Sequence, residues 1–213
     1  MTLQHPTDKL DGYQIDKNWP GMYSDRFVKN FQSIVYSFYR LFAIVLRPKF
    51  IKRETISNPG QAMIIANHIS MLDAFMVIAS FSRKEAVQLT PIRTITRNKY
   101  LFWQPYGHLL RMNGCFPAKP KKGMLHGLDA AQRFAETCSL FFFPQGKISD
   151  PADRHQLRSG AAVVANEREI PLIPVFIKKD GLRYVVVRGE SFKADGDDIE
   201  SIMAKVWELE KYV

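Results

Sequence analysis

The first clear pattern of hydrophobic and polar positions is a helical one, in residues 25–47. Large apolar side chains recur there every three or four positions and fall on one stripe: Phe27, Phe31, Ile34, Val35, Phe38, Leu41, Phe42 and Val45. Ser24 or Asp25 can cap the start of this helix, and Pro48 ends it. The periodicity alone favours a helix packed on a sheet. The alternative is a helix in the plane of a membrane, with its apolar stripe among acyl chains and nearby basic residues at the headgroups.

Beyond that helix, periods typical of strands and of helices alternate. Strands are predicted at 62–66, within 86–96, and at 139–143, 171–178 and 183–189. Helices are predicted at 71–81, 123–138, 156–168 and 197–212. This alternation predicts an α/β layer fold. Because no linker divides the alternating region, we expect one α/β domain at 54–213, after an N-terminal arm and helical segment at 1–53.

The composition is that of a globular protein, with 213 residues of which 46% are hydrophobic and 24% charged. The first 26 residues lack an apolar segment, so no signal peptide is expected. No window reaches the roughly 18 to 20 uncharged apolar residues of a spanning helix, which excludes a polytopic membrane protein but not one that lies on a membrane. Only two cysteines, Cys115 and Cys138, are present, which points to a reducing compartment.

The net charge of +9 is unevenly distributed. Residues 1–53 hold nine basic and four acidic residues, residues 54–189 hold eighteen and ten, and residues 190–213 hold three and seven. A basic body suits anionic lipid, an acidic carrier protein, phosphorylated substrates or nucleic acid. Because the aromatic residues fall in apolar stripes and strands rather than among basic residues, we predict no nucleic-acid partner.

The strand predicted at 62–66 is followed by Asn67-His68-Ile69-Ser70-Met71-Leu72-Asp73. Ligands of open α/β sheets gather at the carboxyl ends of strands, so His68 is a candidate general base. If Ser70 caps the next helix, Asp73 could reach back to one imidazole nitrogen and leave the other free to take a proton. The same residues also resemble a capping box, in which Asp73 only caps the helix and His68 lies in a loop. The local sequence leaves both interpretations open.

Other motifs are weak when taken singly. Phe143-Pro144-Gln145-Gly146-Lys147 ends a buried strand, and Ile170–Val175 carries two prolines typical of a strand edge. Basic residues near turns, at 97–99 and 114–122, could hold a phosphate or form a solvated face. We find no metal-ligand spacing, Gly-rich phosphate loop or nucleophile elbow, and therefore predict no metal.

Five blocks in order resemble the glycerolipid acyltransferases, the family of lysophosphatidic acid and glycerol-3-phosphate acyltransferases. The blocks are Asn67-His68 with Asp73, then Lys99, Pro105 and Gly107, then 114–119, then Phe143-Pro144-Gln145-Gly146, then 170–175. The resemblance covers about residues 30–190. It implies a mixed β-sheet flanked by helices, an N-terminal amphipathic membrane-docking helix, and an apolar acyl groove near His68.

The resemblance also implies a reaction and a set of site residues. His68 would be the general base, with Asp73 as its partner, and a lipid hydroxyl would directly attack a thioester on acyl-CoA or acyl carrier protein. No cofactor beyond that co-substrate is implied. The partner would be a membrane lipid, at the cytoplasmic face of a membrane and bound peripherally. The implied substrate-binding positions are Asn67, Lys99, Gly114, Lys119, Phe143, Pro144, Gln145, Gly146 and Lys147.

The sequence departs from the family pattern at charged positions. Gln145 stands where the family usually has Glu, Lys147-Ile148 replace its Thr-Arg, and Lys119-Pro120-Lys121 lacks an acidic residue. Lys is not equivalent to a bidentate Arg on phosphate. The resemblance implies a lysophospholipid acceptor. The departures keep two alternatives open: a lipid or pigment hydroxyl without glycerol phosphate, and a catalytically altered acyl- or lipid-binding protein on the same fold.

Overall fold

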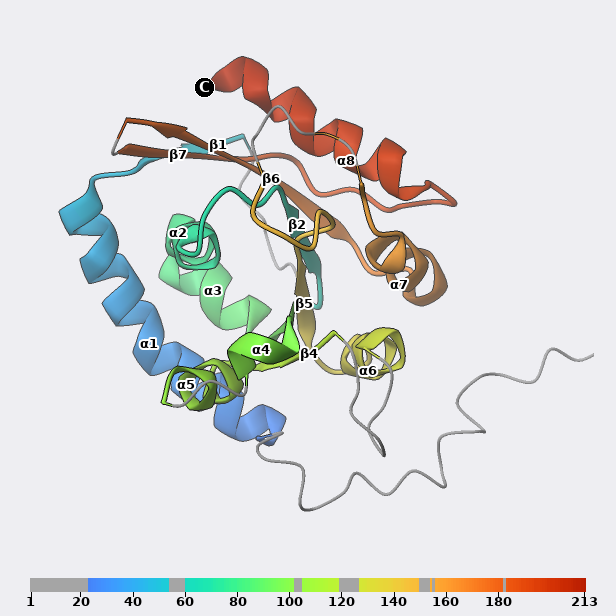
Figure 1. The fold of residues 1–213 in the computed structure, drawn as a ribbon, viewed down its shortest axis with the longest axis horizontal. Helices are drawn as coiled ribbons and strands as arrows, with labels where there is room; N and C mark the ends of the chain where they lie inside the picture. The colour runs from blue at the N-terminus through green and yellow to red at the C-terminus, as the bar shows by residue number, and fades with distance from the viewer. Residues whose placement is uncertain are drawn as a thin grey trace, which may run out of the picture.

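The computed structural model describes residues 23–53, 60–101, 105–118, 127–149, 154, 156–181 and 183–213. Within these ranges, seven strands form one sheet in the order β1-β7-β6-β2-β5-β3-β4 (Figure 1). The strands are β1 (Lys49–Lys52), β2 (Met63–Ala66), β3 (Ile92–Thr96), β4 (Cys115–Pro117), β5 (Ser139–Phe142), β6 (Leu172–Asp180) and β7 (Arg183–Arg188). The mixed α/β fold implied by the motifs is thereby confirmed.

The direction of the strands decides which residues meet at one edge. β6, β2, β5, β3 and β4 run parallel to one another. β7 runs antiparallel to β6, and β1 runs parallel to β7. The carboxyl ends of β2, β5 and β3 therefore lie at the same edge as the beginning of β7, and that edge is where ligands of such sheets bind.

Helices cover both faces of the sheet (Figure 1). They are α1 (Asp25–Leu46), α2 (Asp73–Ser80), α3 (Arg83–Leu89), α4 (Asn98–Leu101), α5 (Tyr106–Met112), α6 (Gly127–Phe134), α7 (Gly160–Arg168), α8 (Ile199–Trp207) and the 3₁₀ helix η2 (Glu208–Tyr212). One apolar cluster joins the sheet to α1, α2 and α3, and a second joins it to α6, α7 and α8. Alternate strand residues supply the two clusters, as the period of a strand with both faces buried requires.

The sequence pattern misses the shortest elements. β1 and β4 have four and three residues, and α3, α4 and α5 have seven, four and seven. A period is hard to recognise over such lengths, and the equally short β2 and β5 are predicted because they are continuous apolar runs. The helix predicted at 123–138 is described as α6, which is shorter, and residues 1–22 of the predicted arm lie outside the described residues. The domain division at residue 53 stays a prediction, although β1, which precedes it, is part of the sheet.

α1 packs on the body through a different face from its apolar stripe. The Ser24 side chain caps the helix, and the left-handed Arg47 ends it before Pro48. The buried positions are Val28, Gln32, Tyr36 and Ala43. Most of the apolar stripe faces outward instead, and Ile34, Phe38, Leu41 and Val45 are all at least 60% exposed. The helix therefore turns a narrow, partly polar face inward and leaves its most hydrophobic face uncovered.

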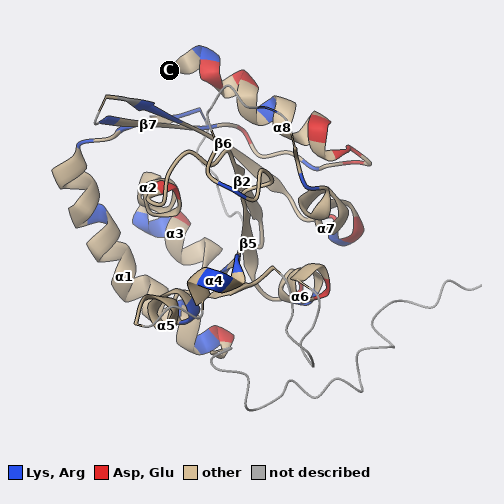
Figure 2. Ribbon diagram, in the orientation of Figure 1, with Lys and Arg blue, Asp and Glu red and all other residues tan. Residues whose placement is uncertain are grey.

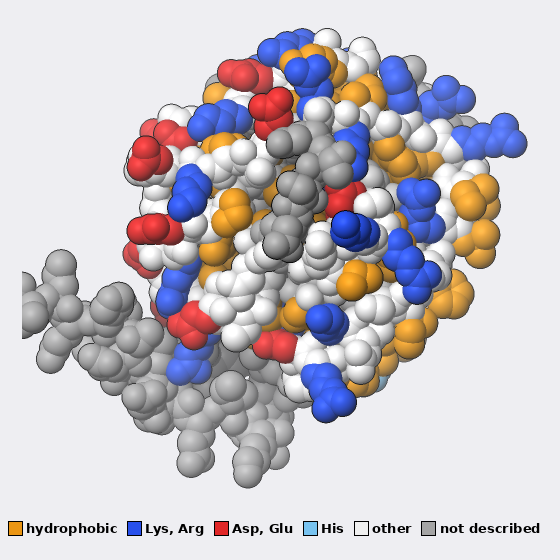
Figure 3. Space-filling view, turned by 180° about the vertical axis from the view of Figure 1, so that it is seen from behind, with side chains coloured by type: hydrophobic (Ala, Val, Ile, Leu, Met, Phe, Trp, Pro, Cys, Tyr) orange, Lys and Arg blue, Asp and Glu red, His pale blue; other side chains and the backbone are white. Residues whose placement is uncertain are grey.

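The figures show where this uncovered face lies. Hydrophobic side chains gather along the edge of the molecule that α1 forms, with Lys and Arg side chains beside them (Figure 3). Long stretches of α1 carry no charge, whereas acidic residues mark α8 (Figure 2). None of the helices in the described ranges has the length and apolar character of a membrane-spanning segment.

A buried ion cluster joins β1, α3 and β7 behind α1. The Glu85 carboxylate lies 3.0 Å from Lys52 Nζ and 3.4 Å from Arg188 Nη2. Arg188 is fully buried, and its guanidinium lies 4.3 Å from the centroid of the Phe81 ring. Burial alone would raise the pKa of Glu85, but hydrogen bonds from the Ser82 backbone and from Lys52 hold it at about 2.

Glu85→Gln should lower the free energy of unfolding at neutral pH by about 3 kcal/mol, because the change leaves the buried charge of Arg188 unpaired. In the native protein, the stabilisation from this carboxylate is complete above the ordinary Glu pKa of 4.5 and is lost as the pH falls toward 2. The Glu85→Gln protein should be less dependent on pH in that interval. Urea unfolding across the interval measures both effects, and equal pH dependence of the two proteins would contradict the assignment.

Candidate active site

The candidate site begins where β2 ends. Asn67 is the first residue after the strand and is buried. Its side-chain amide donates to the Ile177 carbonyl oxygen at 2.7 Å, and its Oδ1 accepts from the Ile177 N–H at 2.7 Å. The Asn67 side chain thus continues the pairing of β2 with β6 and fixes the backbone that carries His68. This position holds the site together rather than lining open space.

His68 and Asp73 are brought together. His68 Nδ1 lies 2.9 Å from Asp73 Oδ2, and the imidazole stacks on the Phe143 ring at a centroid distance of 4.2 Å. Asp73 is completely buried, whereas the His68 side chain is 20% exposed. An ionised carboxylate only accepts, so Nδ1 carries the proton in this contact and Nε2 is left with its lone pair. Nε2 makes no hydrogen bond to any described residue.

Asp73 contacts more than the imidazole, but it does not cap the next helix. Asp73 Oδ2 also accepts from the backbone N–H groups of Ile69 and Ser70, at 2.6 and 2.8 Å. The Ser70 hydroxyl donates to Asp73 Oδ1 at 2.8 Å. The expectation that Ser70 caps the helix with Asp73 at its third position is wrong: α2 begins at Asp73, and Leu72 occupies the cap position. The aspartate therefore closes the turn and contacts the imidazole with the same carboxylate.

The loop after β5 holds the backbone of His68 from both sides. Gln145 Oε1 accepts from the His68 N–H at 2.7 Å, and the Ser149 N–H donates to the His68 carbonyl oxygen at 2.9 Å. The Gln145 side chain is buried, and the turn that places it closes through a bond from the Gly146 N–H to the Phe143 carbonyl oxygen. An amide oxygen can accept this backbone N–H as a carboxylate oxygen would, so Gln can keep the bond at a position where the family usually has Glu.

Cations surround the turn at Gly146. Arg97 Nε donates to the Gly146 carbonyl oxygen at 3.0 Å. Gly146 has a φ of +62°, and a Cβ there would come within 2.5 Å of Arg158 Nε. The neighbouring Lys147 ammonium donates to Gln156 Oε1 at 3.2 Å. The side chains of Arg97, Lys147 and Arg158 are exposed, so this corner of the sheet edge presents positive charge to solvent.

The remaining predicted site residues lie elsewhere or outside the description. Lys99 is exposed on α4, with its ammonium 4.8 Å from the Tyr100 ring centroid. Gly114 lies at the start of β4, three strands from β2, where an added Cβ would meet the Ile92 carbonyl oxygen at 2.5 Å. The structure therefore does not bring Gly114 to His68. Lys119 lies outside the described residues.

Two residues near the site have no sequence signal of their own. Arg158 precedes α7 and reaches Gly146 from twelve positions along the chain, while Tyr184 begins β7 and reaches Ser70 from 114 positions away. Neither belongs to a motif, and the predicted helix at 156–168 and strand at 183–189 that contain them do not indicate a role at the site. Arg97 was part of a basic block in the sequence, although nothing there linked it to Gly146.

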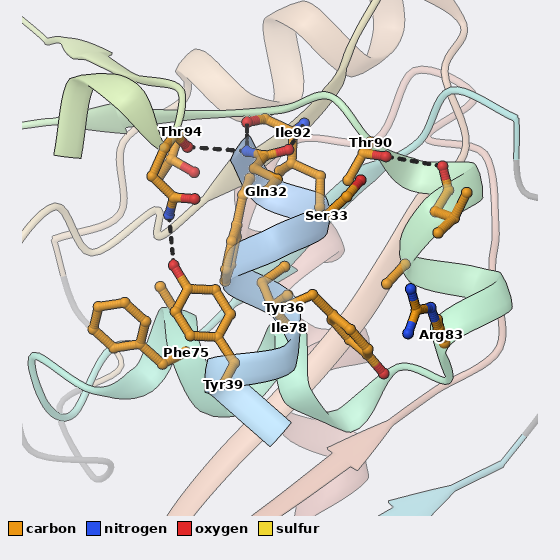
Figure 4. A pocket seen from close by; sticks show the side chains of 15 residues that line it. Gln32, Ser33, Tyr36, Tyr39, Phe75, Ile78, Arg83, Thr90, Ile92 and Thr94 are labelled. Carbon is orange, nitrogen blue, oxygen red and sulfur yellow. Dashed lines mark hydrogen bonds between the residues drawn. The ribbon is translucent and has the colours of Figure 1, made fainter. Parts of the chain in front are cut away.

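An apolar pocket lies between the sheet and the helices α1, α2 and α3. Figure 4 shows Gln32 and Tyr39 reaching into it from α1, with Phe75 and Ile78 on the α2 side. Burial raises the pKa of Tyr39, whose hydroxyl accepts from the Asn113 side chain at 2.8 Å. Packed aromatic rings form the connection between the pocket wall and the site.

That connection runs along β5. Phe141 lines the pocket, and its ring centroid lies 4.6 Å from that of Phe143. Phe143 in turn stacks on His68. Phe75, two residues after Asp73, forms another part of the wall. The arrangement combines a histidine with one free nitrogen, a cationic rim and an apolar pocket a short distance away.

Comparison with known proteins identifies the family of this chain. The Acyltransferase family model matches residues 47–178, a range that includes His68, Asp73 and Gln145. The chain therefore belongs to the acyltransferase family. Human 1-acyl-sn-glycerol-3-phosphate acyltransferase beta is 26% identical over 156 residues, which are 70% of this chain and 53% of the human protein. The chain thus spans about half the length of that relative.

A solved structure shares the fold. It is the 1-acyl-sn-glycerophosphate (LPA) acyltransferase PlsC from Thermotoga maritima, with a TM-score of 0.59 and 13% identity. The match covers 88% of this chain and 78% of the Thermotoga chain. At that identity the likeness establishes the architecture of the sheet and its helices, and the chemistry rests on the site itself.

Gln145→Leu should destabilise the protein by about 1 to 3 kcal/mol, because it leaves the buried His68 N–H without an acceptor. Gln145→Glu keeps an acceptor oxygen at the same place and should destabilise less. Urea unfolding measures the two free energies, and hydrogen exchange at the His68 amide reports the bond directly. Equal losses for the two variants, with unchanged exchange, would exclude this role for Gln145.

Proposed function

We propose that this protein is an O-acyltransferase that transfers a fatty acyl group from a thioester, on CoA or acyl carrier protein, to the hydroxyl of a lysophospholipid. The single observation that carries the proposal is the His68–Asp73 pair, in which Nδ1 is held by a buried carboxylate and Nε2 makes no bond to a described residue. Such a pair removes a proton from a hydroxyl, and family membership supplies the acyl chemistry.

The reaction follows from this geometry in two steps. His68 Nε2 takes the proton of the acceptor hydroxyl while the oxygen attacks the thioester carbonyl carbon, and the Asp73 carboxylate stabilises the imidazolium that forms. The tetrahedral intermediate then collapses, the C–S bond breaks, and the imidazolium returns the proton to the leaving thiolate. The products are an ester and a free thiol, and no acyl-enzyme forms.

The surroundings support a phosphate-bearing acceptor over a neutral lipid or a pigment. Arg97, Lys147 and Arg158 lie around Gly146, in the loop whose Gln145 touches the His68 backbone. Guanidinium groups bind phosphate in a bidentate fashion. In this proposal the two arginines supply the charge that the family usually places at position 148, where this chain has Ile. Lys99 is a more distant contributor on the same grounds.

The donor's acyl chain would occupy the apolar pocket between α1, α2 and α3. Ala74 and Phe75, which follow Asp73 on α2, are part of the pocket wall. The rings of Phe141 and Phe143 lie between that wall and the imidazole. Burial of methylene groups there contributes roughly 0.8 kcal/mol each. Long-chain thioesters are therefore the donors expected to bind best.

The uncovered face of α1 would rest on the membrane that holds the acceptor. The exposed side chains Ile34, Phe38, Leu41 and Val45 form a continuous apolar surface, and Arg40 and Arg47 are close to it in the sequence. Such a helix lies in the interface with its apolar side in the acyl region and its basic residues at anionic headgroups. This association would be peripheral, at the cytoplasmic face.

His68→Ala should lower acyl transfer by about a thousandfold, because general base catalysis typically contributes 10²–10⁴. The measurement is free-thiol release from long-chain acyl-CoA, with lysophosphatidate, glycerol-3-phosphate, other lysolipids or neutral hydroxylated lipids as acceptors. His108→Ala is the matched control, since His108 is exposed on α5 and hydrogen bonds to Tyr23 instead. It should keep wild-type turnover.

Full turnover by the His68→Ala protein would overturn the mechanism. Release with neutral lipids but not with lysophospholipids would move the acceptor to the non-phosphorylated class. If neither acyl-CoA nor acyl carrier protein gave thiol with any acceptor, the protein would be the catalytically altered lipid-binding alternative.

Phe38→Ser combined with Leu41→Ser should weaken binding to anionic phospholipid vesicles more than tenfold, because each buried side chain of this size contributes about 1.5–3 kcal/mol. Both residues are exposed, so the fold should be unaffected. Val213→Ser, which changes an exposed apolar residue outside α1, is the control. Vesicle co-flotation measures binding, and wild-type flotation of the double variant would rule out α1 as the docking surface.

A further inference from the structure

Tyr184 reaches the candidate site from a strand that the motifs do not include. Because β7 runs antiparallel to β6, its first residues lie at the edge where β2 ends. Tyr184 is 3% exposed and packs in the same apolar cluster as α2. Its hydroxyl oxygen lies 2.7 Å from Ser70 Oγ. The start of β7 is thereby connected to the turn that carries Asp73.

Counting protons fixes the direction of this contact. A serine hydroxyl has one proton to donate, and Ser70 gives it to Asp73 Oδ1 at 2.8 Å. Tyr184 must therefore donate to Ser70 Oγ, which also accepts from the Leu72 N–H at 3.0 Å. The result is a directed chain in which Tyr184 donates to Ser70, and Ser70 donates to Asp73.

The two carboxylate oxygens of Asp73 accept hydrogen bonds from different donors. Oδ2 accepts from His68 Nδ1 and from two backbone N–H groups. Among the described residues, the donor to Oδ1 is the Ser70 hydroxyl. The plane of the carboxylate, and so the direction of the lone pair that meets the imidazole, depends on where that hydroxyl points. Because Tyr184 and the Leu72 N–H both donate to Ser70 Oγ, the Ser70 proton can point only toward Asp73.

We propose that Tyr184 is a positioning residue for acyl transfer, acting through Ser70 to fix the Asp73 carboxylate and hence the tautomer of His68. This inference rests on the proposed function for its kinetic consequence. The tautomer itself is a property of the resting protein. A purely structural tyrosine would need its hydroxyl bonded when buried, yet would have no effect on His68.

The test compares Tyr184→Phe with the native protein by two readouts. The kcat for acyl transfer should fall about tenfold with little change in KM, the size expected for losing one hydrogen bond in a charged network. The ¹⁵N shifts of the His68 ring, recorded where the ring is neutral, should show mainly the Nδ1–H form in the native protein. The share of the Nε2–H form should rise in Tyr184→Phe.

Two controls separate positioning from stability. Tyr36→Phe removes another buried tyrosine hydroxyl bond of 2.7 Å, to the Phe81 carbonyl oxygen, and should leave the His68 tautomer unchanged. Ser139→Ala removes a buried serine hydroxyl that accepts from the Ala62 N–H, and should leave kcat unchanged. In a Ser70→Ala background, Tyr184→Phe should have no further effect on the tautomer, because its path through Ser70 is already broken.

The inference is overturned if Tyr184→Phe keeps the native tautomer, or if it changes the tautomer as much in the Ser70→Ala background as alone. Failure of the proposed function is a separate result. In that case the native protein shows no transfer with any donor and acceptor, while the ring shifts still report whether Tyr184 controls His68.

Discussion

The buried carboxylate of Asp73 is the constraint around which the site is built. A charge removed from water is tolerated only when donors surround it, and Asp73 receives four hydrogen bonds from His68, Ile69 and Ser70. Two of these donors are backbone groups, so the turn between β2 and α2 can only take the shape that points them inward. The Ser70 hydroxyl and the imidazole are the other two donors, and the orientation of the imidazole follows from satisfying the charge.

The rest of the sheet edge supports that turn. Asn67 extends the pairing of β2 with β6, and Gln145 holds the His68 N–H from the loop after β5. Ser70 is held in turn from β7 by Tyr184. β6, the loop after β5, and β7 therefore each fix one part of the segment 67–73. Among the described residues, the imidazole is held without a hydrogen bond beyond the one to Asp73. A site built on rigid elements in this way keeps its geometry before any substrate binds.

α1 shows how a helix can be stable with its most apolar side uncovered. Its inward face bonds to the body through polar groups: Gln32 bonds to Ile92 and Asn113, and Tyr36 bonds to the Phe81 carbonyl oxygen. Asp25 pairs with the buried Arg93 at the first turn. These contacts fix the helix against α2 and β3, and its outer apolar side chains stay exposed.

How much the sequence determines differs from one part of the site to another. The spacing of His68 and Asp73 made a contact possible only if His68 preceded the helix, and the structure shows that it does. The α/β alternation follows from local periods. Only the tertiary structure decided that Gln145 serves the His68 backbone, that Arg158 and Tyr184 approach the same edge, and that the Phe-rich stripe of α1 faces outward. Those relations depend on which strands are neighbours and which helix face is covered. A hydrophobic period shows that apolar residues share one face of a helix, without showing whether that face is covered.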